Sequence, residues 1–116
     1  MAVTAFGKKL RKLRIEKDLL LKDMAEHLNI SAAQLSAIEL GKRSISSDIV
    51  SRLIDVYKLE NVDEINDIVA ISQPTQKVDL TDATDNQKKL MVTFARSFTE
   101  LSDDRVEEIQ KLLIGN

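Results

Sequence analysis

Two short helical segments separated by a tight turn constrain the fold of this 116-residue chain more than any other feature. Residues 21–28 and residues 32–39 each carry apolar side chains at the spacing of a helix with one buried face. Asn29 is one of the few residue types that enter the left-handed backbone region easily, so it can end the first helix. Ile30 supplies an apolar plug for the turn, and Ala25 supplies a small side chain where the helices touch. We therefore expect two short helices packed against each other.

The second helix of this pair has a defined start and stop. Ser31 and Gln34 form a capping box, in which the Gln34 side chain reaches back to the Ser31 amide. Leu35 and Ile38 occupy its buried positions, and Gly41 is placed to end it.

Three further helices complete the N-terminal part of the chain. One follows Thr4 as its N-cap, and another starts after Ser46 or Ser47. The last starts at a capping box that opens with Asn61. The positions that these helices are expected to bury are Phe6, Leu10, Leu13, Ile49 or Val50, Leu53, Val56, Tyr57, Ile65, Ile68 and Val69.

The composition then changes, and a second helical region follows. The stretch that begins at Ser72 holds the only Pro and is rich in Gln, Thr and Asp, so it is interpreted as a linker. Residues 77–80 alternate in polarity and could form one short strand. Thr84 opens another capping box, and Ser102 is placed to cap the last helix. The predicted organisation is a helical domain at 1–71, a linker at 72–83 and a C-terminal helical hairpin at 84–116.

The C-terminal hairpin carries more apolar surface than two short helices can bury alone. We expect it to dimerise the chain, and packing back onto the N-terminal domain is the alternative. The residues predicted to make the dimer contact are Leu90, Met91, Phe94, Phe98, Leu101, Val106, Ile109 and Leu113.

Composition and charge narrow the classes of function. The chain has no cysteine and no apolar run near the ~20 residues of a membrane span, so we expect a cytoplasmic protein without disulfides. Residues 1–58 hold 11 Lys and Arg against 7 Asp and Glu, whereas residues 59–116 hold 6 against 12. A basic first half suits a polyanionic partner, although charges that simply cover two solvated faces would give the same counts.

Catalytic chemistry has little support in the sequence. The one histidine, His27, lies on the outer side of a helix, where a solvated role is expected. The acidic pair at 103–104 is typical of a helix start, and the pair at 107–108 is typical of a solvent-exposed helix face. Neither pattern favours acid/base catalysis. The sequence has no Gly-rich phosphate loop, zinc-protease motif or nucleophile elbow. We expect no enzyme activity, no catalytic residue, no cofactor and no metal site.

The segment from Phe6 to Ser46 resembles the Cro/CI-type (XRE) helix-turn-helix family of DNA-binding regulators. The pieces that carry the resemblance are LRKLR at 10–14, AEHLNIS at 25–31 and IELGKR at 38–43. The resemblance extends to Ile71 and implies an all-α fold with a five-helix, lambda-repressor-like domain.

In such domains the third helix lies in the major groove, and nearby basic residues hold phosphates. The resemblance therefore implies phosphate contacts from Lys42, Arg43 and the N-terminus of the second helix. It also implies that Arg14 pairs with Glu39 as a structural ion pair. The residues that it places toward the bases are Ala32, Ala33, Gln34, Ser36 and Ala37.

Several positions depart from the family pattern. Leu20 and Leu21 stand where the family usually has Thr or Ser and then Gln, which cap the second helix and touch phosphate. Asp18 replaces a common Gly. Because alanine cannot hydrogen-bond a base edge, base readout would rest on Gln34, Ser36 and DNA shape.

Three hypotheses about function follow from these observations. The leading one is a homodimeric regulator of bacterial or phage type that acts as a repressor on double-stranded DNA. The alternative is an antitoxin that autoregulates its operon and blocks a toxin through its linker and hairpin. A third is a protein-interaction module that has lost DNA binding.

Overall fold

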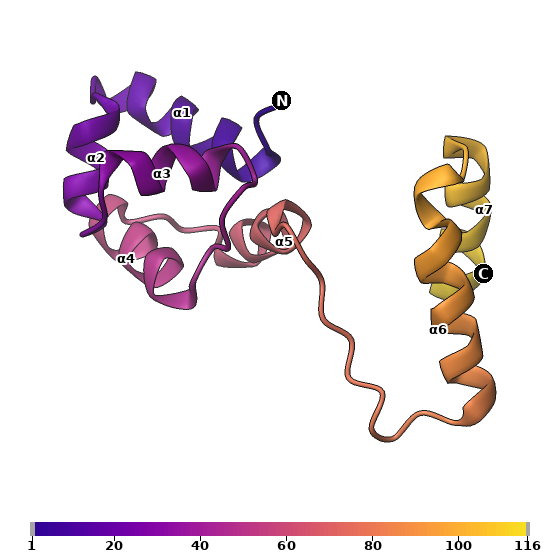
Figure 1. Cartoon of the computed structure of the whole chain (residues 1–116). Helices are drawn as coiled ribbons and strands as arrows, with labels where there is room; N and C mark the ends of the chain where they lie inside the picture. Colours follow the sequence, from indigo (N-terminus) through magenta and orange to yellow (C-terminus); the bar gives the residue numbers. More distant parts are fainter. Residues whose placement is uncertain (1, 116) are drawn as a thin grey trace. The chain divides into compact units, whose positions relative to one another are not determined.

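The computed structural model describes residues 2–115, which are helical without strands and divide into two compact units, Met1–Gln76 and Lys77–Asn116 (Figure 1). The predicted all-α fold is therefore confirmed. In chain order the elements are α1 (Ala5–Lys17), α2 (Leu21–His27), α3 (Ala32–Glu39), α4 (Ser47–Tyr57), α5 (Val62–Ser72), α6 (Asp85–Ser97), the 3₁₀ turn η1 (Phe98–Glu100) and α7 (Asp103–Ile114).

Polar side chains start the helices where the sequence predicts. Thr4 accepts a hydrogen bond from the Gly7 amide at the start of α1, and Ser46 accepts one from Ile49 at the start of α4. Asn61 does the same for the Glu64 amide at the start of α5. Each contact satisfies an amide that has no partner within its own helix, and this fixes the helix start.

The turns that end these helices use the left-handed backbone region. Asn29 has φ of 59° after α2, as its position in the sequence predicts. Gly41 has φ of 72° after α3. Asp18 also lies there, with φ of 55°, as the C-cap of α1, a conformation that Gly would adopt at a lower cost.

Helices α1 to α5 close around one apolar core, with α1 packed against α3 and α5, and α2 against α3. The predicted burial of Val56 is wrong, because 42% of this residue is exposed. Val50, Leu53 and Tyr57 form the buried stripe of α4, and Val56 lies off that stripe. Of the two alternatives at the start of α4, Val50 is in the core and Ile49 is only partly buried. The core residues are Phe6, Leu10, Leu13, Met24, Ala25, Leu28, Leu35, Ile38, Ile45, Val50, Leu53, Tyr57 and Ile65.

The segment between α5 and α6 has no regular secondary structure, so the strand suggested for residues 77–80 is wrong. Alternation alone does not hold a strand, because its backbone groups need a paired neighbour. Asp79 instead accepts hydrogen bonds from the amide and the hydroxyl of Thr81 at 2.9 and 2.6 Å, which forms a turn. These bonds also lower the pKa of the Asp79 carboxyl.

The C-terminal unit is a helical hairpin built from α6, η1 and α7 (Figure 1). Thr84 and Gln87 form the predicted capping box of α6, and Ser102 caps α7. Phe98, predicted on the first helix of the pair, begins the 3₁₀ turn. The described residues of this unit include none that is fully buried, which agrees with the expected surplus of apolar surface.

Candidate DNA-binding site

The α2–turn–α3 pair is fixed by core packing on both sides of the turn and by a hydrogen bond across it. Ala25 is 2% exposed, and its carbonyl accepts a hydrogen bond from the Ile30 amide at 3.0 Å across the turn. Leu28, the C-cap of α2, is also in the core. Leu35 and Ile38 bury the inner face of α3, as predicted. The orientation of α3 is therefore set by core packing.

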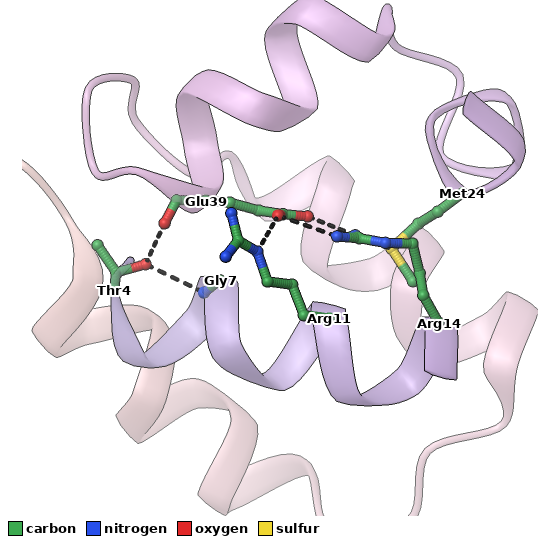
Figure 2. A network of polar contacts seen from close by, with 6 residues as sticks. All are labelled: Thr4, Gly7, Arg11, Arg14, Met24 and Glu39. Atoms are coloured by element: carbon green, nitrogen blue, oxygen red, sulfur yellow. Dashed lines mark hydrogen bonds and ion pairs between the residues drawn. The ribbon is translucent and has the colours of Figure 1, made fainter. Parts of the chain in front are cut away.

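A buried carboxylate ties α3 to α1 (Figure 2). Glu39 is 2% exposed, and both of its oxygens are bound by the Arg14 guanidinium, with 3.1 Å between Nη2 and Oε1. The structure thus brings together the two residues of the predicted ion pair. Arg14 also points one nitrogen at the Met24 sulfur at 3.5 Å. This fork-to-carboxylate geometry fixes the angle between the two helices.

A second arginine contacts the same carboxylate and was not predicted from the sequence. Arg11 Nε lies 3.3 Å from Glu39 Oε1, and the Arg11 side chain is half exposed. Arg11 and Arg14 are three residues apart on a helix, a spacing that places them on one face and could have signalled the contact.

The main chain of Glu39 is held as well (Figure 2). The Thr4 amide and hydroxyl both donate to the Glu39 carbonyl, at 3.0 and 3.1 Å. Gly7 permits this approach, because a Cβ at that position would overlap the Glu39 carbonyl oxygen. The C-terminus of α3 is thus bound through side chain and backbone.

The outer face of α3 carries the residues predicted to face the bases. Ala32 and Ala33 are exposed, whereas Ser36 and Ala37 are partly buried. Gln34 is also partly buried, and the capping box holds its Oε1, which accepts from the Ser31 amide at 2.9 Å. A two-pronged contact to adenine uses both amide groups, so Oε1 would have to accept a second hydrogen bond or leave this box. With the box intact, only Nε2 of Gln34 can donate to a base.

The segment after α3, residues 41–46, is named here the basic loop. It carries Lys42 and Arg43, which are both exposed, and its Ile45 side chain is in the core. Arg43 lines a shallow groove together with Gln34 and with Arg52 of α4, a cation that was not selected from the sequence. Asp48 also lines this groove, so its two arginines and one aspartate leave a net positive charge beside Gln34 of α3.

Residues 10–65 match the helix-turn-helix family. The N-terminal unit is a Cro/CI-type helix-turn-helix domain. The match runs from inside α1 to inside α5 and includes the whole of the α2–turn–α3 pair. This match confirms the resemblance found in the sequence. Proteins of this family bind DNA. No curated protein and no solved structure matches the chain.

The α2 N-terminus of this Cro/CI-type domain has an unusual environment. Leu20, its N-cap residue, is 61% exposed and has no side-chain acceptor to offer. Asp23 accepts from the Leu20 amide at 2.9 Å instead. This helix end was expected to contact phosphate, but the Asp23 carboxylate already accepts from its Leu20 amide. The negative charge of Asp23 also repels an approaching phosphate.

His27 links α2 to α4 of the Cro/CI-type domain. Its Nδ1 lies 2.8 Å from the Tyr57 hydroxyl, and Lys17 Nζ lies 5.6 Å from the centre of the Tyr57 ring. Burial raises the Tyr57 pKa, while nearby Arg14 opposes that rise. These contacts join the C-terminal ends of three helices and give His27 a role in packing.

The C-terminal unit exposes part of its predicted dimer surface. Phe94 and Phe98 stack with ring centroids 5.4 Å apart, and they are 41% and 48% exposed. Leu90 and Leu113 are more exposed, at 63% and 75%. The other predicted contact residues are partly buried, namely Met91, Leu101, Val106 and Ile109.

Two further apolar residues of α7, Leu112 and Ile114, are exposed and were not predicted as contacts. They extend the apolar surface toward the end of the hairpin. Among the helices of residues 2–115, none is long and apolar enough to cross a membrane.

Proposed function

We propose that this protein is a homodimeric repressor that works in the cytoplasm and reads double-stranded DNA with α3 in the major groove. The observation that carries the proposal is the setting of α3. Its inner face is fixed by the core, its C-terminus is bound by α1 through Glu39, and its outer face is open. A helix held in this way can enter the groove without losing further conformational freedom.

The proposed division of labour follows from the chemistry of the side chains. Lys42 and Arg43 hold phosphates, because both are cations next to the end of α3. Gln34 and Ser36 supply the polar contacts to base edges. The methyl groups of Ala32, Ala33 and Ala37 can pack on thymine methyls only. We therefore expect modest discrimination between sequences and strong dependence on salt.

The C-terminal hairpin is proposed to join two copies of the chain. Its exposed apolar residues, with the stacked pair of Phe94 and Phe98 at the centre, are suited to a symmetric contact. Two linked domains can occupy two half-sites one helical turn apart, and this raises the affinity above that of a single domain.

A protein-interaction module without DNA binding is the second candidate. The observation that favours it is the α2 N-terminus, where Leu20 is exposed and Asp23 takes the place of an incoming phosphate. The capping box, which holds the Gln34 oxygen, points in the same direction.

A gel-shift titration separates the two candidates. The wild-type protein is titrated at low salt onto the duplex immediately upstream of its own gene and onto a scrambled duplex. Arg43→Ala should weaken binding to both and reduce the slope of log affinity against log salt. Lys77→Ala, which removes one charge from the segment between α5 and α6, serves as the control and should leave both unchanged. Binding of wild type to neither duplex would refute the repressor and favour the interaction module.

A further inference from the structure

The residues at the end of α5 are bound to the N-terminal unit by their side chains. Ser72, predicted as the first linker residue, is instead the last residue of α5 and is only 4% exposed. Its hydroxyl accepts from the Phe6 amide at 2.9 Å and donates to the Ile68 carbonyl at 2.7 Å. The chain therefore leaves α5 with its end fixed against α1.

Gln73 makes a second and more specific contact. Its Oε1 accepts from the Ile45 amide at 2.9 Å, and its Nε2 donates to the Ile45 carbonyl at 2.9 Å. One side-chain amide thus satisfies both backbone groups of Ile45, as a paired strand would do. Gln73 has the extended conformation, with ψ of 141°, that a residue before proline prefers, so Pro74 helps to keep it in place.

This contact acts on the basic loop. At the start of the loop, the Lys42 amide donates to the Ala37 carbonyl at 2.9 Å. At its end, Ile45 is held by its buried side chain and by Gln73. The backbone is therefore fixed at Lys42 and at Ile45, and the stretch between these two points carries the side chains of Lys42 and Arg43.

We propose that Gln73 is a positioning residue for DNA attachment, which holds the basic loop in the conformation that presents Lys42 and Arg43 to the phosphate backbone. This inference rests on the proposed DNA-binding function. Without the Gln73 amide, the backbone groups of Ile45 would turn to water and the loop would exchange among conformations. Only a fraction of the molecules would then present both cations correctly, and the apparent affinity would fall by that fraction.

The test compares Gln73→Ala with a matched control, Gln76→Ala. Gln76 lies three residues further along, is exposed, and donates to the Ala70 carbonyl at 2.6 Å. Neither substitution changes the charge of the protein. Affinity is measured on the upstream duplex, and exchange of the Ile45 amide is measured by NMR in the absence of DNA. Gln73→Ala should speed this exchange and weaken DNA binding by about tenfold, while Gln76→Ala should do neither.

A double-mutant cycle with Arg43→Ala distinguishes positioning from general stability. If Gln73 acts through the cations of the loop, Gln73→Ala should cost much less affinity in the Arg43→Ala background than in wild type. Gln73→Met keeps the length and the neutrality of the side chain but cannot hydrogen-bond Ile45, and it replaces Gln73→Ala if that variant melts at the assay temperature.

The possible failures can be told apart. Wild type that binds neither duplex would remove the proposed function, and the positioning role with it. Wild type that binds while Gln73→Ala binds equally well would overturn the positioning role alone. Strictly additive losses in the cycle, or unchanged exchange of the Ile45 amide in Gln73→Ala, would also overturn it.

Discussion

Glu39 shows how single residues fix the orientation of α3. Its carboxylate is buried, so the cost of removing it from water must be offset by partners, and Arg14 and Arg11 supply them. Its carbonyl takes two hydrogen bonds from Thr4. Family resemblance was enough to predict the Arg14 pair, because both positions match the family pattern. The Thr4 contact depends on how closely two backbones approach, which side-chain patterns do not reveal.

Substitution of Arg14 should destabilise the domain more than substitution of a neighbouring cation. Arg14→Ala leaves Glu39 buried with Arg11 as its remaining partner, so we expect a loss of about 3 kcal/mol and a fall of roughly 10 °C or more in melting temperature. Lys12 is exposed, and Lys12→Ala should change stability by no more than about 0.5 kcal/mol. Thermal denaturation followed by circular dichroism measures both. Equal and small effects would show that the buried pair contributes little.

Gly7 offers a test in which the usual helix rule should reverse. Glycine to alanine in an exposed helix interior normally stabilises by about 1 kcal/mol. Here the new Cβ would overlap the Glu39 carbonyl oxygen and lie 2.6 Å from a Val3 methyl, so Gly7→Ala should destabilise by about 1–3 kcal/mol. Ser51→Ala, at an exposed position inside α4, is the control and should not destabilise. A melting temperature of Gly7→Ala at or above wild type would contradict the close approach of α1 and α3.

At the scale of elements, prediction from sequence succeeded where local signals are strong. Ser31, Gln34 and Gly41 define α3 to the residue, because caps and turns depend on neighbours along the chain. It failed where tertiary contacts decide. Ser72 appeared to belong to a polar linker, yet its hydroxyl has two partners inside the domain. The pairing of Gln73 with Ile45 joins residues 28 positions apart, and no periodicity signals it.

The capping box of α3 allows its structural and DNA-reading roles to be separated. Gln34→Glu keeps an acceptor for the Ser31 amide, so the helix start and the melting temperature should be preserved. It removes the Nε2 donor, so the preference for the cognate over the scrambled duplex should shrink by about 1–3 kcal/mol. Gln87→Glu makes the same change in the equivalent box of α6, and this control should leave the preference as it is in wild type.

Fluorescence anisotropy on both duplexes gives this preference directly. The added negative charge weakens binding to both duplexes alike, so only the difference between them reports on base readout. A preference that survives Gln34→Glu unchanged would assign readout to Ser36, to methyl contacts or to DNA shape.

For the whole molecule, the boundary between the two compact units alters how the charges are divided between them. The first 58 residues have an excess of cations, but the compact unit Met1–Gln76 holds 11 Lys and Arg and 11 Asp and Glu. The acidic residues around α5 cancel the excess. Attraction to DNA must therefore come from local groups such as the basic loop, and not from the net charge of the domain.

The stacked aromatic pair of the hairpin is the proposed centre of the contact between two chains. Phe94→Ala combined with Phe98→Ala removes the stacked pair from the exposed surface of the hairpin. On the proposed dimer, wild type should sediment as a dimer and the full-length variant as a monomer at the same concentration. Val92→Ala is the matched control, because Val92 is also an exposed apolar residue of α6 but lies two positions from Phe94, on a different side of the helix.

Loss of the dimer should also lower the affinity for DNA. Once the two domains are independent, binding to a palindromic duplex should weaken steeply, while binding to a single half-site should stay the same. This pattern follows because the substitutions leave α3 and the basic loop untouched, so each domain keeps its own contacts. Analytical ultracentrifugation and half-site titrations measure the two effects separately. A double variant that still sediments as a dimer would show that the dimer contact does not depend on the stacked aromatic pair.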